Sequence, residues 1–512
     1  MNRRSFVHVF ALGSAGVALG RPFQGRETPE GVGVSITVHS ENSVATVPQN
    51  YNGLSYEAAQ LAHPGFFAPA NKALIAFFRR LSKQGVLRIG GNTSEFTVWS
   101  PAGAPAEATD AAEVGPDTGG AKPRSPATSE AVQNPAHYKR RAGRRLRRTP
   151  VTPEAIRNLA GFLDATGWQL IYGLNLGKGI PEQAAQEAKA VSDSVGRRLI
   201  AFQIGNEPDL YHRNRPWDLR PAGWNFDGYF SQWQEFFKAV RGKVPDAPFG
   251  APDVANLEAT DWVVEFAEKA ANEIVLLSGH YYAEGPPTDP RMTIDRLLAR
   301  DPRLLKYTPQ IMEASRKSHR PFRMTEGNSC YNGGKRGVSD TFASALWAAD
   351  YMLFLAQRGY AGVNFHGGGN GIYTPIAGGI ETGFSARPIY YGLLMGEEFA
   401  GATMVETRVD AKAANVTAYA AKTSSGLRVA IFNKDERQAV HATLGMGTPA
   451  RKATLWRLTA PSVESTTEVR LAGAEVSSDG AWVAQQEEPL TRAHGQYAVD
   501  LPAASAAIVF LS

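Results

Sequence analysis

The feature that most constrains the fold of this chain is a regular alternation of short apolar runs with amphipathic stretches. Eight runs have the length and apolar content of buried strands, at residues 51–56, 86–91, 169–176, 199–205, 249–254, 274–282, 322–326 and 362–366. Helical spacing of apolar residues separates most of them, at residues 71–83, 153–166, 181–194, 228–241 and 339–357. Alternating strands and helices build α/β folds, and eight repeats close into a (β/α)8 barrel. We therefore expect a TIM barrel over residues 49–402.

The C-terminal part of the chain loses the helical periodicity at about residue 403. Short alternating runs take its place, at residues 416–420, 427–433, 454–458 and 506–511, with Gly, Ser, Asp and Pro between them. This pattern is typical of a β-sandwich, so we expect one over residues 403–512. Residues 32–47 alternate as an antiparallel strand pair would, and we expect the segment 26–48 to join that sandwich.

The first 25 residues resemble an export signal. Arg3 and Arg4, followed by Phe6, precede an apolar run over residues 7–19, which is shorter than the roughly 20 residues needed to cross a bilayer. Paired arginines in this position are typical of the twin-arginine type of signal. We therefore expect an exported protein, periplasmic or secreted, with no stable membrane association after removal of the signal.

Residues 101–150 interrupt the barrel pattern. The segment is rich in Ala, Pro, Gly and Thr, and seven residues between Lys139 and Arg148 are basic, which exceeds the net charge of +5 for the whole chain. It has too few apolar residues to bury, so we expect a flexible surface loop. A patch for an anionic polysaccharide is the alternative. Nucleic acid is disfavoured as a partner because no aromatic residues are interleaved with the basic ones.

The chain offers little for metal or redox chemistry. Its single cysteine, Cys330, excludes an intramolecular disulfide, and we expect it to be a small buried filler. Its ten histidines show no metal-ligand spacing. We expect neither a metal nor a cofactor.

Two glutamates, Glu207 and Glu326, each end a strand-like run. Either one alone would also suit an ordinary junction between a strand and a loop. Together they fall at the ends of the fourth and seventh expected strands, and in a barrel the carboxyl ends of all strands face one mouth. Two carboxylates that meet there are the usual means of breaking a glycosidic bond.

We expect these two carboxylates to differ in role because their surroundings differ. Glu207 is assigned as the acid/base, and Glu326 as the nucleophile, kept ionised by donors such as Arg88 and a tyrosine hydroxyl. A separation of about 5–5.5 Å between the carboxyl groups would make the reaction retaining, through a covalent glycosyl-enzyme.

The residues around these glutamates resemble a known group of enzymes. Gly205-Asn206-Glu207-Pro208, with a glutamate on a later strand, is similar to the clan of retaining barrel glycosidases with catalytic glutamates on strands four and seven. More narrowly, the chain resembles glycoside hydrolase family 79, the β-glucuronidase and heparanase family. The motifs that carry this resemblance are Leu87-Arg88-Ile89-Gly90-Gly91-Asn92, Gly279-His280-Tyr281-Tyr282, the run from Glu326 to Gly334, and Gly371-Ile372-Tyr373.

The resemblance implies roles for residues beside the two glutamates. Asn206 would hydrogen-bond the sugar 2-hydroxyl, a bond that strengthens in the transition state. Asn92 would also contact the substrate. Tyr282 would orient and stabilise the nucleophile, whereas Tyr281 alternates to the other face of its strand and should be structural.

The resemblance also implies a pocket for the carboxylate of a uronic acid. Tyr331, the backbone N–H groups around Gly333 and Gly334, and Tyr373 would hold it. Neutral O–H and N–H donors bind a carboxylate through charge-assisted hydrogen bonds, and glycine permits a close approach. A rim aromatic is the alternative for Tyr331, and a core tyrosine is the alternative for Tyr373.

One position departs from the heparanase pattern. Glu57 stands where the resemblance implies an aspartate, so the wall of the substrate-binding subsite should differ. Heparanase members carry an excised linker near the position of the 101–150 insertion. An insertion that covers the cleft implies exo action, and its removal would allow endo action.

We therefore expect a retaining exo-β-glucuronidase that acts on terminal β-linked glucuronic acid, 4-O-methylated forms included. Its partners would be oligosaccharides, polysaccharides or glycosides that contain glucuronic acid. An endo-β-glucuronidase acting on heparan-like polysaccharide is the enzymatic alternative. A non-catalytic carbohydrate-binding protein is the alternative from another class.

Overall fold

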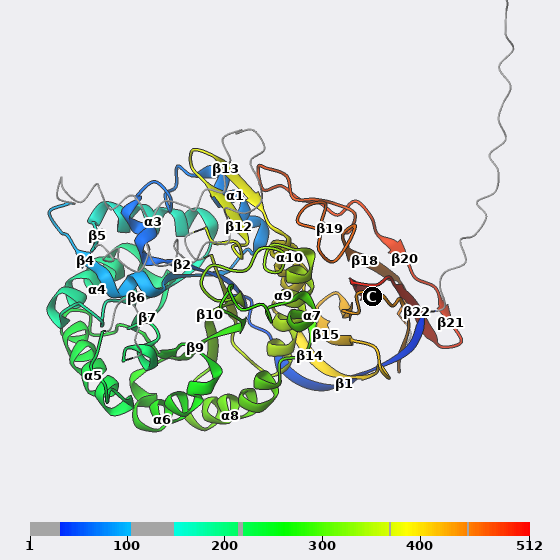
Figure 1. Ribbon diagram of the computed structural model, residues 1–512, viewed down its shortest axis with the longest axis horizontal. Coiled ribbons are helices and arrows are strands. Elements are labelled where there is room, and N and C mark those ends of the chain that lie inside the picture. The colour runs from blue at the N-terminus through cyan, green and yellow to red at the C-terminus, as the bar shows by residue number, and fades with distance from the viewer. Residues whose placement is uncertain (1–30, 104–147, 213–218, 368–369, 448–449) are drawn as a thin grey trace, which may run out of the picture.

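The computed structural model describes residues 31–103, 148–212, 219–367, 370–447 and 450–512. Two bodies lie side by side in Figure 1, a barrel surrounded by helices and a strand-rich domain that holds the C-terminus. The signal expected over residues 1–25 and most of the 101–150 insertion lie outside the described residues, so both expectations stay predictions.

Eight parallel strands close the barrel, which confirms the predicted fold. Around the ring they follow the order β10, β11, β2, β3, β6, β7, β8 and β9. The ring is closed where β11, the last barrel strand along the chain, pairs with β2, the first. The strands are β2 (Asn52–Glu57), β3 (Val86–Gly90), β6 (Gln169–Leu174), β7 (Leu199–Ile204), β8 (Phe249–Val254), β9 (Leu276–Glu284), β10 (Phe322–Cys330) and β11 (Val363–His366). Counted from β2, β7 is the fourth strand and β10 the seventh.

The helices that accompany these strands begin and end at recognisable signals. They are α1 (Lys72–Leu81), α3 (Pro153–Thr166), α4 (Pro181–Val195), α5 (Phe226–Lys243), α6 (Thr260–Ala270), α7 (Ile294–Leu298), α8 (Pro302–Ser318), α9 (Phe342–Gln357) and α10 (Pro388–Glu397). At the start of α3, the hydroxyl of Thr152 accepts a hydrogen bond from the backbone N–H of Ala155 at 3.2 Å. Pro153 occupies the first helical position, and Gly167 ends the helix in a left-handed conformation.

The barrel strands are unbroken apolar runs because both of their faces are covered. Strands β3, β8 and β10 are buried along their whole length. One face of each strand packs against the surrounding helices, and the other fills the inside of the barrel.

The C-terminal domain is built on an eleven-stranded sheet in the order β19, β18, β23, β16, β15, β14, β1, β17, β22 and β21, with β20 paired to β18. Its strands are β1 (Val32–Thr46), β14 (Thr403–Asp410), β15 (Val416–Thr423), β16 (Gly426–Asn433), β17 (Val440–Met446), β18 (Ala453–Thr459), β19 (Arg470–Leu471), β20 (Glu488–Pro489), β21 (Arg492–Ala493), β22 (Gln496–Leu501) and β23 (Ser505–Leu511). Side chains from both halves of this sheet enclose a second apolar core, as in a β-sandwich.

Strand β1 differs from the prediction. The sequence pattern indicated a strand pair over residues 32–47, but the structure has one long strand there, Val32–Thr46. It pairs antiparallel with β14 on one edge and parallel with β17 on the other. An irregularity in the β14 pairing between His39 and Ser43 accommodates the polar middle of the strand.

Helices α9 and α10 lie between the two bodies (Figure 1). Every residue of α9 from Phe342 to Ala356 is buried. A helix that is apolar on all sides must be covered on all sides. Helix α9 contacts strand β10 of the barrel on one side and strands β1, β14 and β15 of the sandwich on the other. It therefore joins the two domains through a shared apolar interface.

Two small ribbons lie outside the main sheets. Strands β4 (Thr97–Trp99) and β5 (Thr149–Val151) pair in parallel, which brings together the two chain segments that flank the 101–150 insertion. Strands β12 (Ile376–Gly379) and β13 (Gly383–Ala386) form an antiparallel hairpin. Because β4 follows the loop at the carboxyl end of β3, the base of the insertion lies on the mouth side of the barrel.

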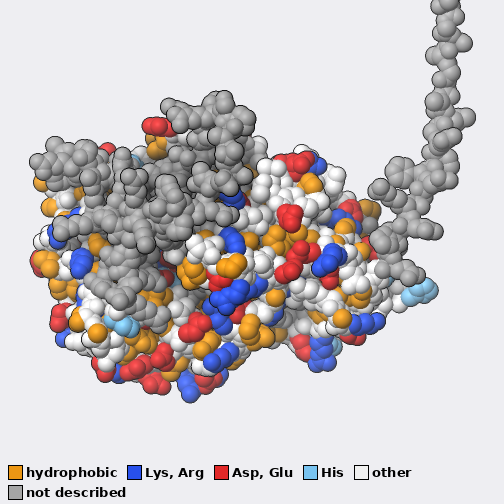
Figure 2. Space-filling model, viewed as in Figure 1, with side chains coloured by type: hydrophobic (Ala, Val, Ile, Leu, Met, Phe, Trp, Pro, Cys, Tyr) orange, Lys and Arg blue, Asp and Glu red, His pale blue; other side chains and the backbone are white. Residues whose placement is uncertain are grey.

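Charged side chains of both signs are interspersed on the described part of the face shown in Figure 2. Among the described residues, no helix combines the length and the apolar character that crossing a membrane requires.

Candidate active site

Glu207 follows β7 on a short left-handed turn. Gly205 has φ +90° and Glu207 has φ +52°. A Cβ on Gly205 would lie 2.8 Å from the Tyr211 hydroxyl and 2.9 Å from a methyl carbon of Leu176, so only glycine fits there. The backbone N–H of Glu207 donates to the carbonyl of Asp253 at 3.0 Å, which fixes the turn against the neighbouring strand β8. The turn aims the buried Glu207 side chain at the barrel mouth.

Glu326 lies within β10, and both of its carboxylate oxygens accept hydrogen bonds. Tyr282 donates to Oε1 at 2.7 Å, and Arg88 donates to Oε2 at 2.6 Å. Burial by itself would raise the pKa of this carboxyl, but the charges of His366, His280 and Arg88, with the Tyr282 hydrogen bond, hold its pKa at about 2. Glu326 is therefore a carboxylate at any pH near neutrality.

The two glutamates come together across the mouth. A carboxylate oxygen of Glu207, one of Glu326 and a ring nitrogen of His280 all lie within 4.8 Å of one another. Closure of the barrel brings the carboxyl ends of strands four and seven to one mouth, where the two side chains approach each other from different strands, and the sequence alone does not measure their separation.

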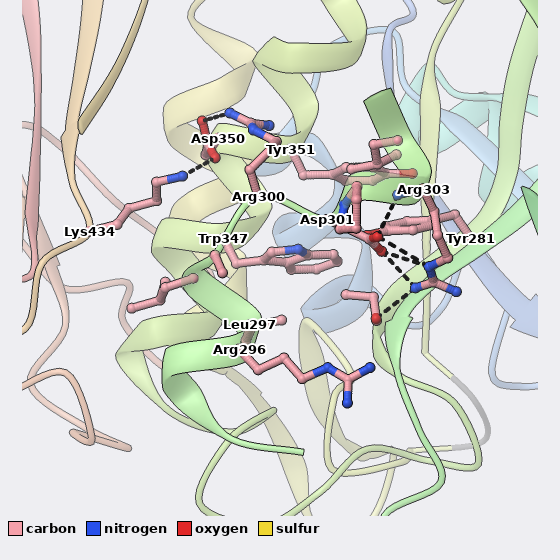
Figure 3. A pocket seen from close by; sticks show the side chains of 15 residues that line it. Tyr281, Arg296, Leu297, Arg300, Asp301, Arg303, Trp347, Asp350, Tyr351 and Lys434 are labelled. Carbon is pink, nitrogen blue, oxygen red and sulfur yellow. Dashed lines mark hydrogen bonds and ion pairs between the residues drawn. The ribbon is translucent and has the colours of Figure 1, made fainter. Parts of the chain in front are cut away.

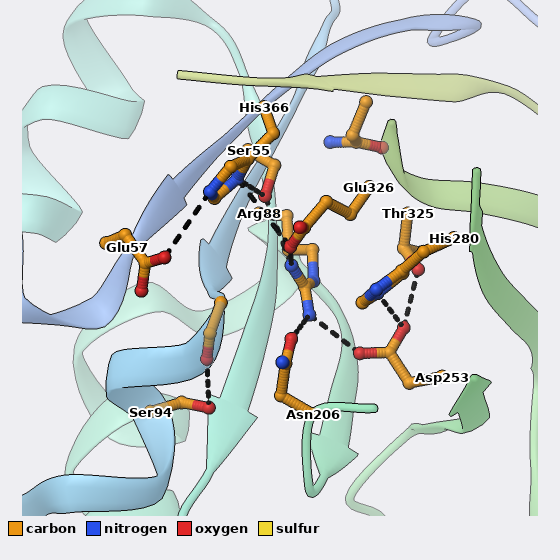
Figure 4. Close-up of polar contacts among 12 residues, drawn as sticks. Ser55, Glu57, Arg88, Ser94, Asn206, Asp253, His280, Thr325, Glu326 and His366 are labelled. Carbon is orange, nitrogen blue, oxygen red and sulfur yellow. Dashed lines mark hydrogen bonds and ion pairs between the residues drawn. The ribbon is translucent and has the colours of Figure 1, made fainter. Parts of the chain in front are cut away.

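Arg88, on β3, is the centre of a buried polar network (Figure 4). Its Nη1 donates to Glu326 and to Ser55, and its Nη2 donates to Asn206 at 2.8 Å and to Asp253 at 2.7 Å. The acidic partners raise its pKa further although burial opposes this, so the guanidinium stays charged. One side chain thus orients both Glu326 and Asn206, the residue next to Glu207.

His280 and Asp253 lie behind Glu207. The Nδ1 atom of His280 is 3.3 Å from Glu207 Oε1, and its Nε2 atom is 3.1 Å from Asp253 Oδ1. Burial opposes protonation of His280, but the charges of Asp253 and Glu326 outweigh it and raise its pKa to about 10. Asp253 in turn keeps a pKa well below its usual range, because Arg88 and His280 outweigh its burial. A cationic imidazolium therefore faces one carboxylate oxygen of Glu207.

Sequence reasoning did not assign roles to either residue of this pair. Asp253 is the polar residue near the end of the fifth strand, and His280 precedes Tyr282 in the sixth. Both stand near the carboxyl ends of barrel strands. The signal available in the sequence was therefore a polar residue near the end of an expected strand.

Asn206 and Asn92 lie beside Glu207. The side-chain oxygen of Asn206 accepts the Arg88 hydrogen bond, so its amide nitrogen points the other way, 3.4 Å from the Asn92 oxygen. Beneath them, the buried Glu95 carboxylate accepts hydrogen bonds from the backbone N–H groups of Asn206 and Gly177. Burial raises the pKa of Glu95 to about 7, although these donors and Tyr211 favour its charged form. Sequence analysis missed Glu95, which ties together the loops after β6 and β7.

The side chain of Glu57, at the end of β2, is held in place mainly by Thr93. Its Oε2 atom accepts hydrogen bonds from the hydroxyl and the backbone N–H of Thr93, at 2.6 and 2.9 Å. Its Oε1 atom lies 3.5 Å from His366, whose other ring nitrogen is 3.6 Å from Glu326. His366, at the end of the eighth strand, was not assigned a role from the sequence. Glu57 therefore connects to Glu326 through this imidazole.

Three tyrosines gather on one side of Glu326. The Tyr282 ring lies 6.4 Å from that of Tyr331 and 6.2 Å from that of Tyr373, centroid to centroid. Tyr331 is 39% exposed and stands at the rim, whereas Tyr373 is buried. The Tyr331 side chain thus combines the rim position with a contact to Tyr282.

Two glycines of the same loop have positive φ angles, a backbone conformation in which glycine is favoured. Gly333 and Gly334 have φ values of +91° and +90°. A Cβ on Gly334 would lie 2.8 Å from the backbone nitrogen of Tyr373, whereas one on Gly333 would meet nothing within 4 Å. The space beside Gly333 is therefore open to a ligand, and the loop packs closely on Tyr373 at Gly334.

Tyr281 and Cys330 have surroundings that suit structural roles. The Tyr281 hydroxyl donates to Asp301 at 2.8 Å on the opposite face of β9 from Tyr282. Cys330 is buried, and burial raises the pKa of its thiol to about 12, so it is a neutral filler.

Among the described residues, the group with atoms near enough to share a metal ion is Glu207, His280 and Glu326. Both oxygens of Glu326 accept hydrogen bonds from protein donors, and His280 faces a carboxylate on each side. These engagements suit an acid/base and a nucleophile better than a set of metal ligands.

The sequence and the fold both have relatives. The glycosyl hydrolase family 79 C-terminal beta domain matches residues 415–508. The chain is 25% identical over 452 residues to a β-glucuronidase from Aspergillus niger, an alignment that covers 80% of this chain and 75% of that protein. It is 29% identical over 256 residues to a β-glucuronidase from Neurospora crassa, covering 44% of this chain and 45% of that one.

Among solved structures, a 4-O-α-L-rhamnosyl-β-D-glucuronidase from Fusarium oxysporum, determined as a Rha-GlcA complex, has a TM-score of 0.71 and 19% sequence identity. The match covers 93% of this chain and 100% of that one, so the barrel and the sandwich are both shared. Together these likenesses confirm the resemblance seen in the sequence: the chain is a glycosidase that carries the C-terminal β domain of glycoside hydrolase family 79 behind a (β/α)8 barrel.

Proposed function

We propose that the chain is a retaining exo-β-glucuronidase, which releases terminal β-linked glucuronic acid, including 4-O-methylated residues. The observation that carries the reaction type is the carboxylate pair, with oxygens of Glu207 and Glu326 within 4.8 Å of each other. Retaining glycosidases keep the two carboxyl groups about 5–5.5 Å apart, whereas inverting ones need about 6.5–9.5 Å to admit a water. The short separation supports retention.

The first step forms a covalent glycosyl-enzyme. The Glu326 carboxylate attacks the anomeric carbon, and the bond from that carbon to the aglycone oxygen breaks. Glu207 gives its proton to the departing oxygen. Arg88 and Tyr282 hold the attacking carboxylate in its charged form and fixed orientation. Asn206, fixed by Arg88, is available to the sugar 2-hydroxyl.

The second step returns the enzyme to its starting state. Glu207, now a carboxylate, takes a proton from a water molecule as that water attacks the anomeric carbon, and Glu326 departs with the electron pair of the broken bond. Two displacements at one carbon give net retention. The His280 ring lies 3.3 Å from Glu207 Oε1 and helps to fix the orientation of this carboxyl group.

The uronic acid specificity rests on the tyrosine and glycine cluster. Tyr282 contacts Tyr331 and Tyr373 beside the nucleophile, and the loop at Gly333 leaves open space next to them. Hydroxyl and backbone N–H donors of Tyr331, Gly333, Gly334 and Tyr373 suit a carboxylate. The two fungal relatives are named β-glucuronidases, and the similar solved structure is named a rhamnosyl-glucuronidase. Glucuronate is therefore the sugar that the chemistry and the relatives both favour.

Exo action is proposed because the ends of the 101–150 insertion meet in the β4–β5 ribbon on the mouth side of the barrel. An insertion based there more often blocks subsites than extends them. Endo action on a heparan-like chain is the competing outcome.

The same proposal has two further parts. The protein is exported through the twin-arginine signal expected over residues 1–25, and Glu57 and Asn92 contact the substrate.

The proposal is tested by assaying the mature protein with p-nitrophenyl β-glucuronide beside the matching β-glucoside and β-xyloside. We expect the protein to hydrolyse the glucuronide, and proton NMR should show that the β-anomer of the product forms first. The Glu326→Gln variant should show no turnover. Cleavage of a glucuronate-containing polymer to oligosaccharides, without action on the small glucuronide, would replace exo by endo action. An α-anomer as the first product would refute retention.

The carboxylate pocket makes a separate prediction. Tyr373→Phe removes one hydroxyl beside Tyr282, so glucuronide hydrolysis should fall by about tenfold or more, the value of one hydrogen bond to a charged group. Any residual hydrolysis of the uncharged xyloside should be affected much less. The measurement is kcat/KM on both substrates, and equal losses on the two would contradict a carboxylate-binding role for Tyr373.

A further inference from the structure

A second cavity lies away from the two glutamates, where the barrel meets the sandwich (Figure 3). Its volume is about 340 Å³. The wall consists of residues 296–304, which link α7 to α8, the Tyr281 face of β9, part of α9, and Lys434 just after β16. Tyr281 and Tyr282 point to opposite faces of β9, so the strand separates this cavity from the catalytic pocket.

The wall of the cavity carries an excess of buried positive charge. Lys434 and Arg300 share one carboxylate, that of Asp350, at 2.8 and 3.1 Å. The side chain of Lys434 is only 2% exposed and that of Asp350 only 7%. Two cations facing one anion leave a net charge of about +1 in a poorly solvated place, and an uncompensated buried charge is costly.

The acids of the wall have no capacity left for the cations. Asp350 also accepts hydrogen bonds from Thr417 and Tyr419 of the sandwich, both at 2.7 Å. The other acid, Asp301, is occupied by the Arg303 guanidinium and by the Tyr281 hydroxyl. Both carboxylates are thus saturated by donors from the protein.

The cations, in contrast, have donors to spare. Within the described ranges, the Lys434 ammonium donates only to Asp350, and Arg300 donates only through Nη2. At the rim, Arg296 is 49% exposed and lies 3.6 Å from its nearest acidic partner, Glu284. The wall therefore offers positive charge and N–H donors that suit a ligand which accepts hydrogen bonds and carries negative charge.

The rest of the wall is apolar and aromatic. The Trp347 and Tyr351 rings stack at 5.3 Å, and those of Tyr351 and Tyr281 stack at 5.0 Å. Leu297 and Leu298 complete this surface. A cavity with cationic donors at one side and flat apolar walls suits a sugar ring that bears an anionic group.

We propose that this cavity binds an oxyanion carried on a sugar, the carboxylate of a free or chain-terminal uronic acid, at a site separate from the catalytic pair. The oxyanion part follows from the surplus charge and donors of Lys434, Arg300 and Arg296. The choice of a uronate rests on the proposed function. The bound anion pairs with Lys434 and Arg300 and thereby stabilises the contact between barrel and sandwich.

The experiment compares melting temperatures of the full mature protein in sulfate, in D-glucuronate, and in chloride at matched ionic strength. Three proteins are used: wild type, Lys434→Met, and Lys452→Met as a matched control. Lys452 is also on the sandwich, but it is 68% exposed and pairs with Glu487 at the surface. Because any binding in the catalytic pocket is common to all three, the difference between variants reports the cavity alone.

We expect sulfate and glucuronate, at a hundredfold excess over their dissociation constants, to raise the Tm of wild type and Lys452→Met by about 2–3 °C beyond chloride. Lys434→Met should lose the sulfate shift. Its Tm without added anion should be no lower than that of wild type, since Asp350 keeps Arg300, Thr417 and Tyr419 as partners.

Equal sulfate shifts in all three proteins, or shifts no larger than those in chloride, would overturn the oxyanion site. A sulfate shift that depends on Lys434, with a glucuronate shift that does not, would overturn the uronate assignment. If Lys434→Met does not fold, Arg296→Gln at the exposed rim replaces it and should at least halve the sulfate shift. Failure of the proposed function appears separately, as absent glucuronide turnover by wild type.

Discussion

At the scale of single residues, the main feature of the active site is that several of its charged side chains are buried. Glu326 is buried, yet two histidines, an arginine and a tyrosine hydroxyl keep it ionised. His280 is also buried, yet Asp253 and Glu326 keep it protonated. Each group holds its neighbour in the charge state that the proposed mechanism needs, so removal of one donor should shift the titration of the others.

The Tyr282→Phe variant tests this coupling. Loss of a hydrogen bond to the charged form raises the pKa of Glu326, so the acidic limb of kcat/KM should move to higher pH. The kcat value at neutral pH should fall by roughly 10- to 100-fold, the value of a hydrogen bond to a charged group. The measurement is a pH profile of kcat/KM on the glucuronide.

Tyr281→Phe is the matched control, because the adjacent hydroxyl donates to Asp301 on the other face of the same strand. Its acidic limb should coincide with that of wild type. If Tyr282→Phe also leaves the limb in place, the hydroxyl does not set the ionisation of Glu326.

At the scale of elements, helices and loops hold the strand ends that carry the chemistry. Glu95, in the short 3-10 helix Asn92–Phe96 after β3, accepts backbone hydrogen bonds from the loops after β6 and β7. The position of Asn206 and Glu207 therefore depends on three consecutive barrel loops. The helices themselves depend on local signals at their ends, which are individually worth about 1 kcal/mol.

Helix α3 offers a prediction about stability alone. Thr152→Ala removes the hydroxyl that caps Ala155 N–H and should lower the free energy of unfolding by about 1 kcal/mol, while Thr152→Ser should retain most of it. The measurement is urea denaturation followed by circular dichroism. Helix α4 provides the control, because its capping residue Ile180 makes no side-chain hydrogen bond and Ile180→Ala leaves capping unchanged. An equal loss for Thr152→Ala and Thr152→Ser would show that the hydroxyl does not stabilise the helix.

At the scale of the whole molecule, the barrel and the sandwich share one interface. Helix α9 is buried on every side between them. Its Asp350 accepts hydrogen bonds from two sandwich side chains, Thr417 and Tyr419, and pairs with Lys434. An apolar helix with a fully engaged carboxylate links the two domains, so we expect them to unfold in one transition.

Tyr419→Phe tests this link. The variant removes a hydroxyl that donates to Asp350 at 2.7 Å, so it should cost about 1.5 kcal/mol, because the acceptor is charged. Tyr497→Phe is the control in the same sheet, since the Tyr497 hydroxyl makes no hydrogen bond to any described residue. Calorimetry should give one transition for both proteins, with a lower Tm for Tyr419→Phe only. Separate transitions for the two domains would contradict a shared cooperative unit.

The amino-acid sequence by itself determined the features that depend on neighbours along the chain. Apolar runs of strand length, helix caps such as Thr152 and the alternation of Tyr281 and Tyr282 are local, so the barrel followed from periodicity, and so did the assignment of Glu207 and Glu326 to its fourth and seventh strands. The end of the seventh strand did not, because β10 continues past Glu326 to Cys330. The sandwich followed from the change of period near residue 403 in the same way.

Only the tertiary structure decided which distant residues meet. Asp253, His280 and His366 lie on different strands, and each becomes a partner of the glutamates only when the barrel closes. Residues 32–46 form one strand because β14 and β17, nearly 400 residues later, cover its two edges. Alternation along a chain reports that a face is buried, but it carries no information on what buries it, because that contact is made by residues far away in the sequence.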